Sequence, residues 1–330
     1  MAIERTVGVN VKNIVHGGLR VLDVLALPAV YASAKLLRFI RANGLHKMRL
    51  SKRALMKVGV LPVTDHYYEP LFSPAHLRMP LQRERFLPGI DLNIEEQLRI
   101  LNEYDFGNEL SEIPVKGTNP WEFAYENGVF EAGDAEYWYC LIRMFKPGRI
   151  VEIGSGKSTL MAIRALSQNK RDDPGYTCEH ICIEPFESPY LEKHGITVIR
   201  KNVEQVGLSV FTELKRNDIL FIDSSHIIRP QGDVLFEYLE VLPILNSGVI
   251  VHVHDIFTPR DYPERWLVDE MKLWNEQYLL EAFLTNNREF RVIAALNYLK
   301  HNHFAALSGK CPVLKMKPDS EPGSFYLIKN

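Results

Sequence analysis

The sequence of 330 residues predicts an α/β protein in which a doubly wound, mostly parallel sheet of seven strands follows an N-terminal helical arm and a cap. Three observations predict this fold. Apolar strand-like runs alternate with amphipathic helix-like runs after residue 135. A glycine-rich loop, Glu152-Ile-Gly-Ser-Gly156, joins the first of these strands to a helix. The first 60 residues are basic and helical in pattern. Strands that alternate with helices form parallel sheets covered on both faces.

Residues 1–58 are predicted to form a basic amphipathic arm. Residues 1–60 carry eleven Lys and Arg against Glu4 and Asp23, a net charge of about +9, which leaves about −11 for the rest of the chain. Apolar and basic residues alternate at helical spacing over 19–57 and predict two or three helices, broken near Pro28 and Gly44. Two partners stay open for residues 1–57: an anionic membrane surface, or a protein surface such as a second subunit of a homo-oligomer.

Residues 59–134 are predicted to be a cap on the substrate side of the sheet. This region is rich in proline, aromatic and polar residues and has one helical pattern, over residues 94–104. Such composition is typical of segments that wrap a core rather than build one.

Residues 135–330 are predicted to hold the sheet. Strand patterns cover residues 149–153, 180–184, 196–200, 218–223, 248–254, 289–295 and 323–329. Helical patterns cover residues 158–167, 203–216, 230–245 and 264–286. The last two strands are expected to pair antiparallel at one edge, as in many otherwise parallel sheets.

The glycine-rich loop predicts a nucleotide-like ligand. Gly154 and Gly156 follow an apolar strand and open a helix, where a doubly wound sheet brings bare backbone close to a ligand. A P-loop needs glycine where Val151 stands, and a dinucleotide motif needs a small residue where Thr159 stands. Glu184 ends the next strand, where a carboxylate can accept both hydroxyls of a ribose.

Acidic and histidine side chains end two later strands. Asp223 and Asp255 follow these strands, so we expect them to converge at the carboxyl edge of the sheet. His226 lies near Asp223, and an imidazole with a pKa of about 6.5 suits a general base at neutral pH. The set Asp223, His254 and Asp255 also fits a divalent cation, either Mg, Mn, Fe or Zn. Hydrogen bonding by the same residues without a metal is the alternative.

Four motifs resemble those of class I S-adenosylmethionine-dependent methyltransferases, which have a Rossmann-like fold. They are Val151-Glu-Ile-Gly-Ser-Gly-Lys-Ser-Thr159, Ile183-Glu-Pro185, Phe221-Ile-Asp-Ser-Ser-His226 and Val251-His-Val-His-Asp255. The resemblance covers about residues 120–330 and is strongest to the branch that methylates small molecules or sugars on oxygen. It implies S-adenosyl-L-methionine as cofactor, bound by Glu152, Gly154, Ser155, Gly156, Glu184, Asn202, Val203 and Asp223.

The resemblance also implies roles within the site. Gly154 and Gly156 would face the methionine part of the cofactor, Glu184 the ribose, and Asn202-Val203 the adenine region. His254 stands where metal-dependent relatives usually have a carboxylate, so a metal-free site stays open.

The expected activity is O-methylation of a hydroxyl on a sugar, glycan or secondary metabolite, with His226, Asp223 and Asp255 as the catalytic residues. Two alternatives remain: a nicotinamide-dependent oxidoreductase, disfavoured by Thr159, and a non-catalytic scaffold that docks through the arm. Nucleic acid is not an expected partner, because the basic residues are confined to the arm. Four irregularly spaced cysteines favour a cytoplasmic protein, peripheral at the inner membrane face if the arm binds lipid.

Overall fold

The computed structural model describes residues 2–119, 121–186 and 191–330, with side chains from residue 17 onward. The chain divides into two compact units, Met1–Arg78 and Met79–Asn330. Residues 79–134, the larger part of the predicted cap, therefore fold with the sheet. Within the described ranges, no helix has the length and apolar character needed to cross a membrane.

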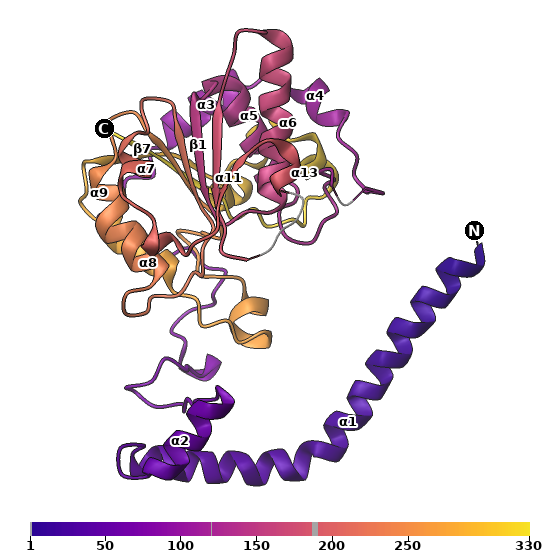
Figure 1. The fold of residues 1–330 in the computed structure, drawn as a ribbon, viewed down its shortest axis with the longest axis vertical. Coiled ribbons are helices and arrows are strands. Elements are labelled where there is room, and N and C mark those ends of the chain that lie inside the picture. Colours follow the sequence, from indigo (N-terminus) through magenta and orange to yellow (C-terminus); the bar gives the residue numbers. More distant parts are fainter. Residues whose placement is uncertain (1, 120, 187–190) are drawn as a thin grey trace. The chain divides into compact units, whose positions relative to one another are not determined.

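The first unit consists mainly of two helices, α1 (Ala2–Asn43) and α2 (Arg49–Val58), followed by the short η1 (Pro74–His76). The predicted break near Gly44 is confirmed, since Gly44 has a φ of +88° and ends α1. The predicted break near Pro28 is wrong, because α1 continues through that residue. A proline removes one N–H donor and bends a helix without having to end it, and Figure 1 shows a bend along α1.

The second unit holds a seven-stranded sheet with the order β3-β2-β1-β4-β5-β7-β6. The strands are β1 (Arg149–Ile153), β2 (Glu179–Ile183), β3 (Thr197–Ile199), β4 (Ile219–Ile222), β5 (Ile250–Val253), β6 (Phe290–Ala295) and β7 (Phe325–Lys329). The first five run parallel, and β7 is antiparallel to both β5 and β6. The predicted doubly wound sheet with an antiparallel edge pair is confirmed. The strand order reverses between β1 and β4, where such sheets bind ligands.

Helices cover both faces of the sheet (Figure 1). They are α3 (Ile94–Glu103), α4 (Gly107–Ser111), α5 (Asp134–Phe145), α6 (Lys157–Asp172), η2 (Leu191–His194), η3 (Val203–Gln205), α7 (Ser209–Thr212), α8 (Asp233–Phe236), η4 (Glu237–Val241), α9 (Leu242–Ile244), η5 (Arg265–Asp269), α10 (Glu276–Leu284), α11 (Leu296–Asn302), α12 (Phe304–Lys310) and α13 (Pro312–Met316). Ile150 of β1 packs in the core on the side of α5 and α6, whereas Val151 packs on the side of α8, η4 and α10. This alternation is the period of a strand buried on both faces.

Two of the helices predicted from the sequence are each divided into two shorter helices in the structure. The pattern over 203–216 folds as η3 and α7 with Gly207 between them. The pattern over 264–286 folds as η5 and α10, separated by a turn in which Met271 has a φ of +52°. Backbone N–H groups of Asn275 and Glu276 donate to the carbonyl of His226 instead of to a helical partner. Tertiary hydrogen bonds therefore override the local helical pattern here.

Candidate active site

Strand register brings the ends of three strands level. Ile153 of β1 pairs with Ile183 of β2 and with Ile222 of β4. The residues that follow, Gly154, Glu184 and Asp223, therefore lie together at the carboxyl edge of the sheet.

Gly154 is fixed between the two neighbouring strands. Its φ is +82°, and a Cβ atom there would lie 2.1 Å from the backbone oxygen of Asp223. Its N–H donates to the carbonyl of Ile183 at 3.1 Å. Only glycine fits this position, so the loop presents bare backbone at the edge of the sheet.

Glu184 is held by the same loop. One carboxylate oxygen accepts the N–H of Ser155 at 3.2 Å, and the other accepts the N–H of Phe186 at 2.9 Å. Each carboxylate oxygen has a second lone pair, so Glu184 can still accept hydrogen bonds from a ligand.

A cavity of about 450 Å³ opens beside these residues, a size typical of small-molecule sites. Five of the predicted cofactor residues line it together, namely Gly154, Glu184, Asn202, Val203 and Asp223. Arg229 and Asp233 line it as well. Arg229 lies in the loop before α8 and Asp233 is the first residue of that helix, and the sequence predicted neither because neither belongs to a distinctive motif.

Glu152 lies beneath the loop rather than in this cavity. Its side chain is fully buried, accepts a hydrogen bond from the Thr159 hydroxyl at 2.7 Å and lies 2.6 Å from His180 Nε2. Thr159 in turn accepts the N–H of Gly156 at 3.1 Å. Glu152 thus holds the glycine-rich loop in place through Thr159. Donor atoms of Glu152, His180 and Cys182 also lie within 4.8 Å of one another.

Asp223, His226 and Asp255 come together at the ends of β4 and β5. His226 Nε2 lies 3.3 Å from Asp223 Oδ1 and 3.5 Å from Asp255 Oδ2. One donor atom from each of the three lies within 4.8 Å of the others. Both His226 and Asp255 have a φ of +59°, a conformation that non-glycine residues adopt at a cost and that is frequent at functional sites.

The other side of the His226 ring is held by a buried carboxylate. His226 Nδ1 lies 2.8 Å from Glu276 Oε2, and the Tyr238 hydroxyl donates to Glu276 Oε1 at 3.1 Å. The Trp274 ring packs against the imidazole, with 4.3 Å between centroids. The sequence did not predict Glu276, because the helical pattern over 264–286 conceals the non-helical residues 271–275, which place Glu276 at the start of α10.

His254, the third residue of the predicted cation site, lies next to this cluster. Its Nδ1 is 3.5 Å from Asp223 Oδ1 and 3.6 Å from Asp255 Oδ1. Its Nε2 is 3.8 Å from Asp134, whose carboxylate accepts two backbone N–H groups. Among the residues that the structure describes, the close donor set at this edge contains His226 in place of His254.

The charges in the cluster shift one another. Burial alone would lower the pKa of His226, but hydrogen bonds to Asp223 and Glu276 raise it to about 10. Burial would raise the pKa of Asp223, yet His254 and His226 hold it well below its usual range. Burial raises the pKa of Asp255. At neutral pH the cluster therefore pairs the protonated His226 imidazole with the Asp223 carboxylate.

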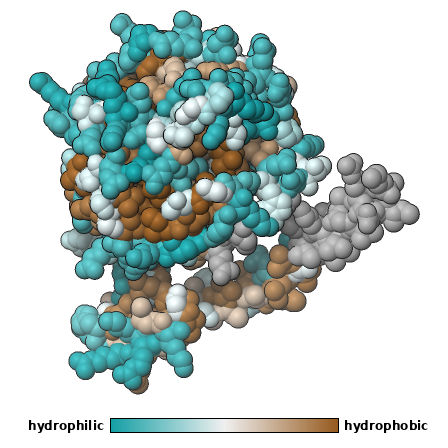
Figure 2. All heavy atoms as spheres, turned by 45° about the horizontal axis from the view of Figure 1, so that its top comes forward, coloured by the Kyte–Doolittle hydropathy of each residue, from teal (hydrophilic) through white to brown (hydrophobic). Residues whose placement is uncertain are grey.

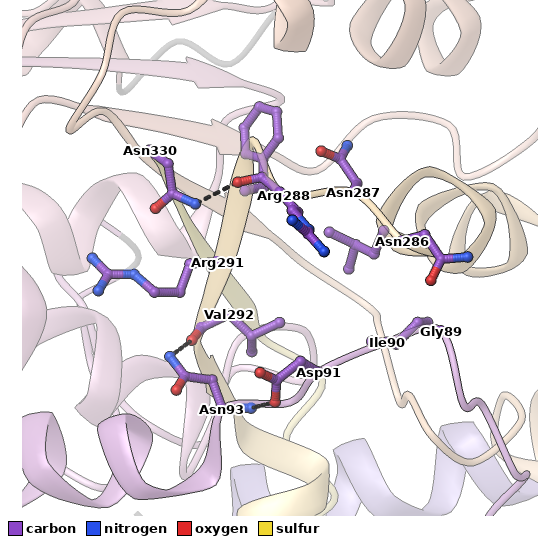
Figure 3. A pocket seen from close by; sticks show the side chains of 12 residues that line it. Gly89, Ile90, Asp91, Asn93, Asn286, Asn287, Arg288, Arg291, Val292 and Asn330 are labelled. Carbon is purple, nitrogen blue, oxygen red and sulfur yellow. Dashed lines mark hydrogen bonds between the residues drawn. The ribbon is translucent and has the colours of Figure 1, made fainter.

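A second cavity, of about 460 Å³, lies at the opposite edge of the sheet (Figure 3). It is formed where β6 begins and β7 ends. The Asn93 amide donates to the Val292 carbonyl at 3.1 Å, and the Asn330 amide donates to the Arg288 carbonyl at 2.6 Å (Figure 3). None of the predicted site residues lines this cavity, and the amides of Asn93, Asn287 and Asn330 already donate to backbone carbonyls.

Residues 151–256 match a family model described as a methyltransferase domain. Over 176 residues the chain is 32% identical to an uncharacterized protein of Archaeoglobus fulgidus. The aligned segment is 49% of this chain and 78% of that relative.

Two solved structures are distantly similar. The O-methyltransferase from Bacillus cereus in complex with SAH has a TM-score of 0.36 at 12% identity, covering 72% of this chain and 91% of that chain. The O-methyltransferase TomG from Streptomyces achromogenes in complex with SAM has a TM-score of 0.35 at 12% identity, covering 70% and 89%.

Proposed function

Because this chain belongs to the class I S-adenosylmethionine-dependent methyltransferases, we propose that it methylates a hydroxyl oxygen of a small acceptor such as a sugar, a glycan or a secondary metabolite. One observation carries the proposal: Asp223 both lines the 450 Å³ cavity and belongs to the cluster with His226 and Asp255. Cofactor and acceptor chemistry would therefore meet at one residue.

The residues of the cavity fit S-adenosylmethionine. The Gly154 backbone would lie against the methionine part, and Asn202 and Val203 against the adenine. The free lone pairs of Glu184 would accept the two ribose hydroxyls, while its bonds to Ser155 and Phe186 keep the carboxylate in place. When bound, this cofactor supplies an electrophilic methyl group.

We assign His226 as the base that takes the acceptor proton. Glu276 holds Nδ1, so Nε2 points toward the carboxylates of Asp223 and Asp255, where an acceptor hydroxyl would bind. His226 must lose its proton before it can act as a base, because its raised pKa keeps the imidazole protonated at neutral pH. Nε2 would then take the proton of the acceptor hydroxyl and hold it as the oxygen is methylated. Glu276 would stabilise the imidazolium that forms.

A divalent cation offers a second mechanism for the same reaction. Asp223, Asp255 and His226 Nε2 together provide two oxygen donors and one nitrogen donor, a set that favours Mn, Fe or Zn over Mg. A cation there would lower the pKa of the acceptor hydroxyl and would occupy the nitrogen that the base mechanism needs. Metal dependence therefore distinguishes the two mechanisms.

Calorimetric titration tests the proposal. The full chain is titrated with S-adenosylmethionine, S-adenosylhomocysteine and the oxidised nicotinamide cofactor, each with and without Mn²⁺. We expect both adenosyl compounds to bind and the nicotinamide to remain unbound. Binding of the nicotinamide alone would favour the oxidoreductase alternative, and binding of none of the three would favour a scaffold. Turnover that survives chelation by EDTA would support His226 as a metal-free base.

A further inference from the structure

Helix α1 exposes many large apolar side chains. Leu22 is 61% exposed, Leu25 73%, Leu36 59% and Phe39 59%. Single exposed apolar residues are ordinary, but a continuous run of them marks an interaction surface. Brown apolar spheres lie along the arm beside teal polar ones in Figure 2.

These four side chains share one face of α1, while further exposed apolar side chains lie on its other sides, namely Leu19, Val24, Leu27, Val30 and Tyr31. The apolar face consists of Val21, Leu22, Leu25, Ala29, Ala32, Leu36 and Phe39. Successive members are three or four positions apart or adjacent, which places them on one side of a helix with 3.6 residues per turn. Arg20, Lys35, Arg38 and Arg41 fall on the other side and make a basic face.

Helix α2 repeats this arrangement in the same unit. Its Leu50 and Val58 are 79% and 77% exposed, and none of its residues is buried. Basic residues make up four of its ten positions, at Arg49, Lys52, Arg53 and Lys57. Over residues 17–58 the only acidic residue is Asp23.

We propose that α1 and α2 bind the surface of an anionic membrane, with the apolar face in the interface and the basic residues at the lipid headgroups. An amphipathic helix with a cationic polar face binds anionic lipid through both contributions. The charge of the arm favours anionic lipid over a second copy of the arm as the partner. Two copies would bring together two strongly basic segments with almost no acidic residues to pair with them. The inference is independent of the proposed methyl transfer.

Vesicle sedimentation of the full chain tests lipid binding. Vesicles of phosphatidylcholine alone are compared with vesicles that contain about one third phosphatidylglycerol, at about 0.1 M and about 0.5 M NaCl. We expect binding to the anionic vesicles at low salt, and at least about tenfold weaker binding with neutral lipid or high salt. Equal binding to both vesicle types, or none to either, overturns the proposal.

A matched pair of double variants tests the apolar face. The first variant, Leu22→Glu with Leu36→Glu, places two negative charges on the apolar face. The second, Leu27→Glu with Tyr31→Glu, adds the same charge on the opposite side of the helix, because each of its sites is five positions from a site of the first. Leu27 and Tyr31 are each 61% exposed, so the four sites match in exposure. The first variant should lose at least about tenfold in vesicle affinity and the second much less.

Self-association is the competing explanation for the apolar face. Sedimentation velocity without lipid separates the two, because the proposal expects the same molecular mass for the full chain and for both double variants. Equal losses of vesicle affinity in the two variants would contradict the proposal. So would an oligomer that only the Leu22→Glu and Leu36→Glu variant dissociates.

Discussion

At the scale of single residues, the tip of β2 places a carboxylate where a ligand can use it. Glu184 accepts two backbone N–H groups and is only half-buried, so its remaining lone pairs face the cavity. If they accept the ribose hydroxyls, Glu184→Ala should weaken S-adenosylmethionine binding by about 1.5–3 kcal/mol, as loss of charge-assisted hydrogen bonds does. Calorimetry on a variant with an unchanged unfolding midpoint measures this difference. Wild-type affinity in the folded variant would remove Glu184 from the cofactor site.

His226 and Glu276 act as a pair in the proposed mechanism. His226→Ala should abolish turnover and leave cofactor affinity unchanged, because His226 does not line the cofactor cavity. Glu276→Gln should lower kcat at least about tenfold with little change in the KM for the cofactor, because the amide holds the ring but stabilises the imidazolium poorly.

Tyr238→Phe is the matched control for this pair. It removes only the hydrogen bond to the other oxygen of Glu276 and should cost much less activity. Steady-state kinetics over a range of pH measures all three variants. A Glu276→Gln variant that raises KM and keeps kcat would contradict the positioning role.

At the scale of elements, strands were the most predictable part of the fold. Their apolar runs differ from the observed bounds by at most two residues, because burial on both faces leaves an uninterrupted pattern. The convergence of Asp223 and Asp255 followed from this, since residues after parallel strands meet at one edge. Glu276 could not be found in the same way, because the start of α10 is fixed by hydrogen bonds from Asn275 and Glu276 to the distant His226 carbonyl.

One buried acid links α5 to α13 and makes stability depend on pH. The Glu136 carboxylate is fully buried and accepts N–H groups of Gly133, Val313 and Leu314. Burial raises its pKa to about 7 against these hydrogen bonds, compared with about 4.3 in an unfolded chain. Between these two values the folded chain holds a proton that the unfolded chain has released. The free energy of unfolding should therefore fall as pH rises from about 4 to about 7.

Urea unfolding at several pH values measures this effect. The contribution of Glu136 should decrease by on the order of 3 kcal/mol across the window. Glu136→Gln should flatten the dependence, whereas Glu112→Gln, at an exposed position, should leave it as in the wild type. The same slope in all three proteins would mean that the Glu136 carboxylate is already ionised at low pH in the folded chain.

At the scale of the whole molecule, charge and chemistry are divided between two units. The unit Met1–Arg78 contains the basic helices, and the unit Met79–Asn330 contains the sheet, both cavities at its edges and the Asp223 cluster. All four tryptophans also lie in the second unit, at positions 121, 138, 266 and 274. Tryptophan fluorescence therefore reports on the sheet unit alone, while far-ultraviolet circular dichroism reports on both units.

This division allows cofactor binding to be located by thermal unfolding. A ligand that binds only the folded state stabilises it by about 2.7 kcal/mol at a free concentration of about 100 times its Kd. For a unit of this size, we expect saturating S-adenosylmethionine to raise the fluorescence midpoint by about 5–10 °C. The Glu184→Ala variant should need a correspondingly higher concentration for the same shift. A fluorescence midpoint that stays constant at saturation, in a chain that unfolds reversibly, would show that the sheet unit does not hold this cofactor.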